Sequence, residues 1–174
     1  MPKIIDNVRE QLLAVAKRQV TERGYAKTTI RSVAGECGLA VGTVYNYFSS
    51  KDMLIASFMV VDWLDCIRRA AESPSTDAEQ RLRAIYDALL RFSDKYNALF
   101  ADSDAHKAFS GVFSDRHKQL RSQLAELILP VCESCGSDDS AFLSEFIAEA
   151  LLSWTMAGVD FDTVSKPLMK LIKK

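Results

Sequence analysis

Apolar residues recur at spacings of three and four along most of the chain, the period of an α-helix with one buried side. No long stretch of β-branched residues alternates with polar ones, so the pattern does not favour a sheet. The first apolar stripe ends near Gly24, a residue type that closes helices, and consists of Ile5, Val8, Leu12, Val15 and Val20. The pattern therefore predicts an all-α fold.

Two short helices are expected to follow the first. One begins after Thr28 and Thr29 and stops at Gly38, and the next spans about residues 41–47. Ser50 is a candidate N-cap for a long fourth helix, which Pro74 would end. The N-terminal part of the chain thus predicts three compact helices joined to a longer one.

The rest of the chain predicts a helical body. Thr76 and Glu79 have the spacing of a capping box, which would open a helix that continues to Tyr96. Residues 97–105 are short and ambiguous, and a longer helix follows to about residue 131, with Pro130 near its end. Residues 140–158 and a last segment near Ile172 complete a fold of about nine helices.

Charge is distributed unevenly along the chain. The formal net charge is -1, yet residues 1–51 hold eight Lys or Arg against four Asp or Glu, and the remainder holds 14 against 19. Hydrophobic residues make up 48% and charged residues 26%, as in ordinary globular proteins. A basic N-terminal third on an acidic body is expected where that third faces phosphates.

Several other classes of function find no support in the sequence. No apolar run is long enough for a membrane span and no signal peptide is visible, so we expect a cytoplasmic protein without membrane contact. Cys132 and Cys135 have the spacing of half a zinc or redox site, but no second pair exists, so we expect no metal and free thiols, and a role for the pair stays open. Without a nucleophile motif, a phosphate-binding loop or paired carboxylates, we expect neither an enzyme nor a cofactor.

Residues 29–48 have the pattern of two short helices that cross closely. Ala34 is small enough for the crossing and Gly38 supplies the turn, while the inner side is filled by Leu39, Val44 and Phe48. The outward positions are then Gly42, Thr43, Tyr45 and Tyr47. Tyrosine can contact a thymine methyl or a phosphate, and glycine permits close approach to a base edge. Packing of the tyrosines against the first helix is the alternative.

Two basic residues lie at helix starts, where the partial positive charge of the helix makes a cation unfavourable. Arg31 is in the first turn of the second helix and Lys51 opens the fourth. A DNA phosphate nearby would offset this unfavourable interaction. It would also accept a hydrogen bond from the hydroxyl of Thr28 or Thr29. The alternative for each basic residue alone is a solvated side chain.

The run from Gly24 to Lys51 resembles the DNA-binding domain of TetR-family (tetracycline-repressor-like) transcriptional regulators and covers roughly the first third of the chain. The resemblance implies base or phosphate contact for Arg31, Val41, Gly42, Thr43 and Tyr45, and phosphate contact for Thr29, Tyr47 and Lys51. It also implies a helical body whose middle helices enclose an effector pocket and whose last long helices pair two subunits.

We therefore expect a helix-turn-helix domain in residues 1–50 and an effector-binding and dimerisation domain in residues 51–174. The expected function is a homodimeric repressor that binds a palindromic operator in double-stranded DNA and is released by a small molecule. The alternative is a ligand- or protein-binding module on the same scaffold that does not use DNA. Candidate ligand-binding residues are Trp63, Tyr86 and Tyr96. Candidates for the dimer interface are Leu124, Phe142, Phe146 and Trp154.

Overall fold

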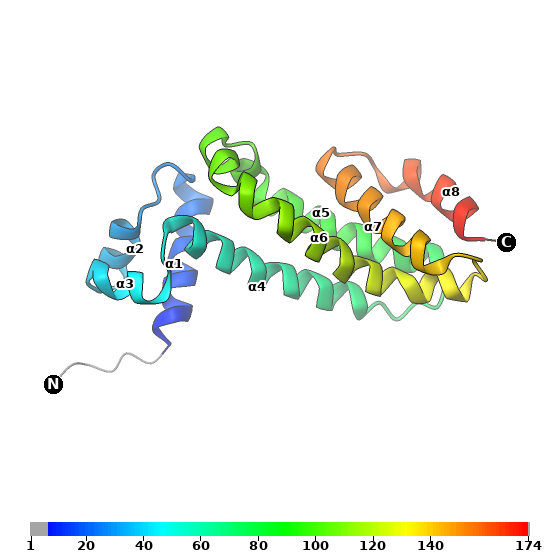
Figure 1. Ribbon diagram of the computed structural model, residues 1–174, viewed down its shortest axis with the longest axis horizontal. Helices are drawn as coiled ribbons and strands as arrows, with labels where there is room; N and C mark the ends of the chain where they lie inside the picture. Colours follow the sequence, from blue (N-terminus) through cyan, green and yellow to red (C-terminus); the bar gives the residue numbers. More distant parts are fainter. Residues whose placement is uncertain (1–6, 174) are drawn as a thin grey trace. The chain divides into compact units, whose positions relative to one another are not determined.

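The structure, a computed structural model, describes residues 7–173 except the side chains of residues 106 and 108–116. It is all-α, as expected, with no strand among the described residues and eight helices against about nine predicted (Figure 1). The helices are α1 (Val8–Arg23), α2 (Ile30–Glu36), α3 (Val41–Tyr47), α4 (Lys51–Ala71), α5 (Ala78–Phe100), α6 (Ser103–Ser134), α7 (Ser140–Met156) and α8 (Phe161–Ile172).

Local signals in the sequence set several of the helix ends. Gly24 follows α1 with φ +83° and Gly38 follows α2 with φ +66°, and this left-handed backbone is one that glycine adopts without steric cost. The hydroxyl of Ser50 accepts from the backbone N–H of Met53 at 3.1 Å, which confirms the predicted N-cap of α4.

The start of α5 differs from the prediction. The capping box expected at Thr76 and Glu79 is wrong, because α5 begins at Ala78 and Asp77 caps it by accepting from the N–H of Gln80 at 2.9 Å. The ambiguous residues 97–105 hold the end of α5, at Phe100, and the start of α6. The ambiguous segment therefore contains a short turn between two long helices.

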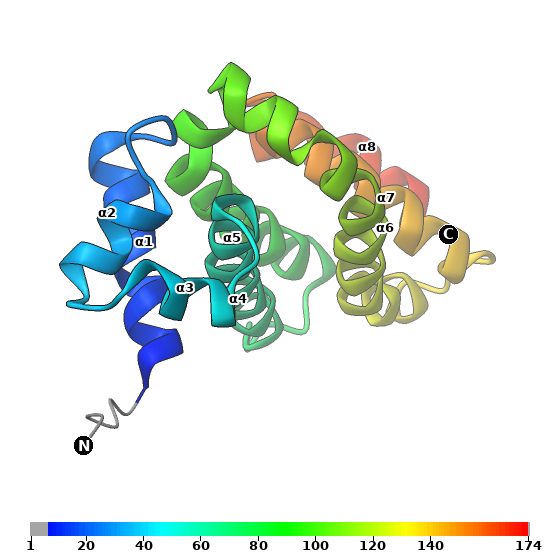
Figure 2. The same cartoon turned by 60° about the vertical axis from the view of Figure 1, so that its left-hand side comes forward.

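The described chain forms two compact units. Unit 1 comprises residues 7–62 and 96–110, and unit 2 comprises residues 63–95 and 111–173, so α4, α5 and α6 each contribute to both. In unit 1, α1, α2 and α3 lie together (Figure 2). Its core is closed by large apolar side chains that are almost fully buried, among them Leu12, Val33, Val44, Phe48, Leu54, Ile55, Phe58 and Leu99.

A polar network connects three helices of unit 1. The carboxylate of Asp62 on α4 lies 2.6 Å from the ammonium of Lys17 on α1 and also accepts from the hydroxyl of Tyr96 on α5. Tyr96 is 2% exposed and its ring stacks on Phe58. Burial and the hydrogen bond to Asp62 raise the pKa of Tyr96, so its hydroxyl keeps its proton at neutral pH. The network joins α1 of the helix-turn-helix to α4 and α5.

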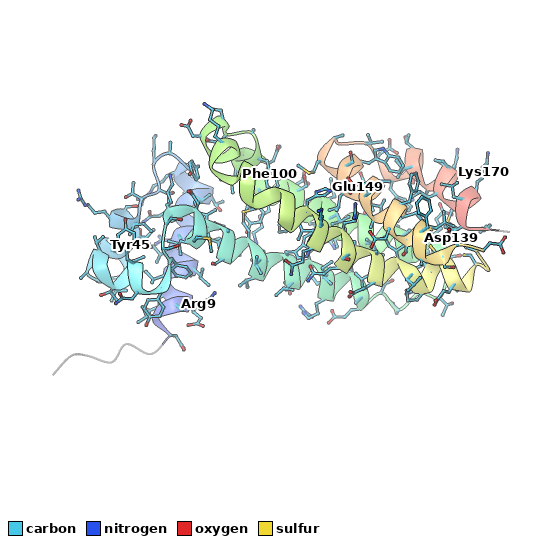
Figure 3. The ribbon with its side chains drawn as sticks, in the orientation of Figure 1. Arg9, Tyr45, Phe100, Asp139, Glu149 and Lys170 are labelled. Carbon is cyan, nitrogen blue, oxygen red and sulfur yellow. The ribbon has the colours of Figure 1, made fainter. Side chains whose placement is uncertain are left out.

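Unit 2 is built around a continuous apolar core from α4 to α8. Its most deeply buried members are Leu82, Ile128, Val131, Ile147, Leu151, Leu168 and Ile172. Trp63 packs edge-on against Phe92, with ring centroids 5.4 Å apart. Glu149, marked on α7 in Figure 3, lies with a carboxylate oxygen 2.9 Å from Nε2 of His117 on α6. The first contact joins α4 to α5, and the second joins α7 to α6.

We expect the Asp62 network to contribute to stability. Tyr96→Phe should lower the free energy of unfolding by about 1 to 2 kcal/mol, because the partly buried carboxylate of Asp62 loses a donor. Asp62→Ala should lower the free energy of unfolding further, since it removes both the acceptor of the buried Tyr96 hydroxyl and the carboxylate that pairs with Lys17. Urea unfolding followed by circular dichroism measures both. Asp65→Asn is the control, since the exposed Asp65 pairs with Arg68 and Arg69 of its own helix; equal losses in Asp65→Asn and Asp62→Ala would contradict the expectation.

Candidate nucleic-acid interface

A polar network fixes α2 against α1. Thr29 caps α2 through a reciprocal pair with Ser32, in which each side-chain oxygen accepts from the other residue's backbone N–H at 3.0 Å. The hydroxyl of Ser32 donates to the side-chain oxygen of Gln19 at 2.6 Å, and the Gln19 amide donates to Glu36 at 2.7 Å. Gln19 is 1% exposed, so α1 supplies a buried polar anchor for both ends of α2.

Buried side chains set the orientation of α3. Val44 is fully buried and Phe48, directly after the helix, is 4% exposed, while Ala34 of α2 is also fully buried. The opposite side of α3 is open, and Tyr45 and Tyr47 are 53% and 47% exposed (Tyr45 is marked in Figure 3). This exposure removes the alternative in which the two tyrosines pack against the first helix.

Most of the predicted DNA-contacting residues reach the surface of unit 1. Thr43 and Lys51 are half-buried, and those that are exposed are Thr29, Arg31, Val41, Gly42, Tyr45 and Tyr47. Thr28 is different, because it is fully buried and its hydroxyl donates to the carbonyl of Gly24 at 2.9 Å. Its side chain supports the turn before α2 and cannot reach DNA in this conformation, so we leave it out of the proposed interface.

Gly42 has ordinary helical backbone and free space around it. A Cβ atom added there would meet no heavy atom within 4 Å, apart from its chain neighbours and its own helix backbone. Glycine is a poor helix former, so neither the backbone nor the packing of the free protein explains this residue. Gly38 contrasts with it, because its φ of +66° disfavours any side chain.

The structure changes the electrostatic argument for Lys51. Its ammonium lies 3.4 Å from the centroid of the Tyr25 ring and donates to the Tyr25 carbonyl at 3.1 Å. Burial lowers the pKa of Lys51, and the carboxylates of Asp52, Asp102 and Asp104 oppose this shift. The free protein thus supplies negative partners of its own at this helix start, so Lys51 does not require a phosphate to balance its charge.

Tyr25 is a residue that the sequence analysis missed. Its hydroxyl donates to Asp52 at 2.5 Å, and burial together with this bond raises the pKa of Tyr25. The contact links the turn before α2 to the first turn of α4 and so holds the helix-turn-helix against α4. A separation of 27 residues left no local signal for it.

The polar tips of the three candidate ligand-binding residues are already occupied within the protein. Trp63 donates to the side-chain oxygen of Gln123 at 2.7 Å, Tyr86 donates to the carbonyl of Val159, and Tyr96 donates to Asp62. All three are at most 3% exposed, and none lines either of the two surface hollows described. Tyr96 belongs to unit 1 and the other two to unit 2.

The candidate dimer residues fall into two groups. Phe142 and Phe146 of α7 are 63% and 46% exposed, and their rings stack with centroids 6.4 Å apart. Trp154 is partly buried against the core, and Leu124 is 1% exposed within it. Leu124 therefore offers no surface to a partner, and we leave it out of the proposed interface.

The N-terminal part of the chain matches a known family. The sequence model described as bacterial regulatory proteins, tetR family, matches residues 12–58, which include α2, α3 and most of α1. The transcriptional repressor KstR2 of Mycobacterium tuberculosis is 26% identical over 132 residues, which cover 71% of this chain and 66% of that protein. KstR2 of Rhodococcus jostii is 26% identical over 183 residues, 94% of this chain and 88% of the relative.

The same likeness extends to the fold. The solved structure of BioQ with its double-stranded DNA operator superposes with a TM-score of 0.60 at 19% sequence identity, and covers 94% of this chain and 96% of BioQ. Over residues 12–58 the chain therefore resembles bacterial regulatory proteins of the tetR family. The exposed residues of α2 and α3 all lie inside the matched range. No described helix is long and apolar enough to cross a membrane.

Gly42 and Gly38, which both lie inside the matched residues 12–58, should respond oppositely to alanine. Gly42→Ala should raise the free energy of unfolding by up to about 1 kcal/mol, because a better helix former enters open space. Gly38→Ala should lower it by about 1 to 2 kcal/mol, because its backbone is left-handed. Thermal and urea unfolding of both variants measure these changes. A loss of stability in Gly42→Ala would show that the free protein does require this glycine.

Proposed function

We propose that this protein is a DNA-binding transcriptional repressor of the TetR family whose α3 enters the major groove of a palindromic operator. The observation that carries the proposal is the exposed outer side of α3, held in place by the buried Val44 and Phe48. Residues 1–50 form the DNA-binding domain in this proposal, and residues 51–174 form the effector-binding and dimerisation domain. The relatives are named as transcriptional repressors, which supports this assignment.

The contacts of the proposed interface follow from the chemistry of the exposed residues. Val41, Thr43 and Tyr45 offer methyl groups, a hydroxyl and a ring to base edges, with Gly42 allowing close approach. Arg31 contacts a base or a phosphate, and phosphate contacts come from Thr29, Tyr47 and Lys51. Of these, Lys51 must turn from its position over the Tyr25 ring toward the phosphate.

Selection of bound sequences from a random DNA library tests the proposal, and fluorescence anisotropy then measures the variants. Lys51→Ala should lower the affinity for selected and for random DNA about equally. It should also make the slope of log affinity against log salt concentration shallower by about one unit per half-site. Tyr45→Ala should lose preference for the selected sequence, and Gly42→Ala should bind it more weakly despite its greater stability.

Binding of all sequences with equal affinity by the wild-type protein would contradict operator recognition. It would favour the alternative of a module that keeps the scaffold without using DNA. A Gly42→Ala variant with wild-type affinity would remove close approach at α3 from the proposal.

The proposal includes a homodimer formed through the exposed face of α7. Phe142, Phe146 and Met156 are 63%, 46% and 64% exposed, an apolar surface that a single subunit leaves in water. A two-fold dimer would present two α3 helices to half-sites about 34 Å apart, one turn of DNA.

Phe146→Glu should dissociate the dimer, because it places a charge in an apolar interface. Light scattering should give the wild-type protein a mass near twice 19.4 kDa and the variant a mass near 19.4 kDa. Leu64→Glu on α4, where Leu64 is 50% exposed, is the matched control and should leave the mass unchanged. A wild-type monomer at micromolar concentration would contradict the proposed dimer.

Release by a small-molecule effector completes the proposal. A ligand lowers operator affinity by the factor by which it binds the DNA-free form more tightly than the DNA-bound form. Operator DNA lowers the affinity for the ligand by the same factor. Because Trp63 and Tyr86 are buried and hydrogen-bonded, an effector among them must displace Gln123 or the Val159 carbonyl, or leave those bonds intact and bind through apolar contacts.

A further inference from the structure

Asn46 lies on the outermost line of α3. In an α-helix a residue two positions from another is turned by about 200°, so Gly42 and Asn46, which flank Val44 in this way, point away from the buried side. Val44 is fully buried and Asn46 is exposed. Within the described residues, the Asn46 side chain has no hydrogen-bond partner, so its amide is available to a ligand.

The composition of α3 makes this amide distinctive. The helix reads Val-Gly-Thr-Val-Tyr-Asn-Tyr and contains no charged side chain. Asn46 is the one side chain of α3 that carries both a fixed pair of donors and a separate acceptor. Gly42, one turn earlier on the same side, leaves open space that lets the helix approach a flat surface closely.

We propose that Asn46 reads an adenine in the major groove of the operator. Its Nδ2 donates to adenine N7, and its Oδ1 accepts from the adenine N6 amino group. Adenine is the base whose major-groove edge offers an acceptor next to a donor. Guanine offers two acceptors, cytosine a donor and thymine an acceptor beside a methyl group, so each would leave part of the amide unpaired. The inference rests on the proposed function and names the base that one residue of the interface recognises.

The test replaces single adenines of a selected operator by 7-deazaadenine, which lacks the N7 acceptor and keeps Watson–Crick pairing. Fluorescence anisotropy compares the wild-type protein, Asn46→Ala, and the control Asn97→Ala, which truncates another exposed asparagine of unit 1. At one adenine of each half-site, the wild-type protein and Asn97→Ala should lose between about fivefold and about 150-fold in affinity. Asn46→Ala should bind the natural operator more weakly and be insensitive to that replacement.

Three results would overturn the inference. Wild-type protein that tolerates 7-deazaadenine at every position does not use an adenine N7. An Asn46→Ala variant that stays as sensitive as the wild-type protein assigns the base to another residue. If Asn46→Ala lowers the affinity for operator and for random DNA equally and stays sensitive to 7-deazaadenine, Asn46 contacts the phosphate backbone instead. In all three the protein still binds DNA, whereas a library that yields no enriched sequence would overturn operator recognition itself.

Discussion

The burial of Val44 is the constraint on which the DNA-binding face depends. A short helix has little stability of its own, so α3 takes its rotation from the apolar side chains that it buries against α1 and α2. Once Val44 and Phe48 are inside, the helical period alone puts Gly42 and Asn46 on the outer side. Gln19 and Ser32 reinforce this arrangement, because their partly buried hydrogen bond holds α2 against α1, and α3 packs against α2.

The sequence predicted the elements whose signals are local. The bounds of α3 and the cap at Ser50 follow from residues within a few positions of each other, and the structure reproduces both. The start of α5 was missed because Thr76 and Asp77 both suit an N-cap, and it is Asp77 whose carboxylate accepts from the backbone N–H of Gln80. Propensity alone does not contain that information.

The candidate site could be predicted from the sequence only where local patterns determine it. Outward positions on α3 could be assigned from the helical period, and the same reasoning would have found Asn46. Thr28 and Lys51 needed the tertiary structure, since the partners of their side chains come from a preceding turn and from Tyr25, 26 residues before Lys51. The hydrogen bond from Trp63 to Gln123 spans 60 residues, so no pattern in the chain could show that its polar tip is occupied.

Hydrogen exchange of the full chain, with and without selected operator DNA, tests most directly whether α2 and α3 form the DNA interface. Backbone amides in peptides that cover residues 29–51 should exchange more slowly in the complex, because DNA excludes water from them and suppresses local opening of α3. Peptides of α8 serve as the internal comparison. A saturated complex in which residues 29–51 exchange as fast as in the free protein would contradict the account.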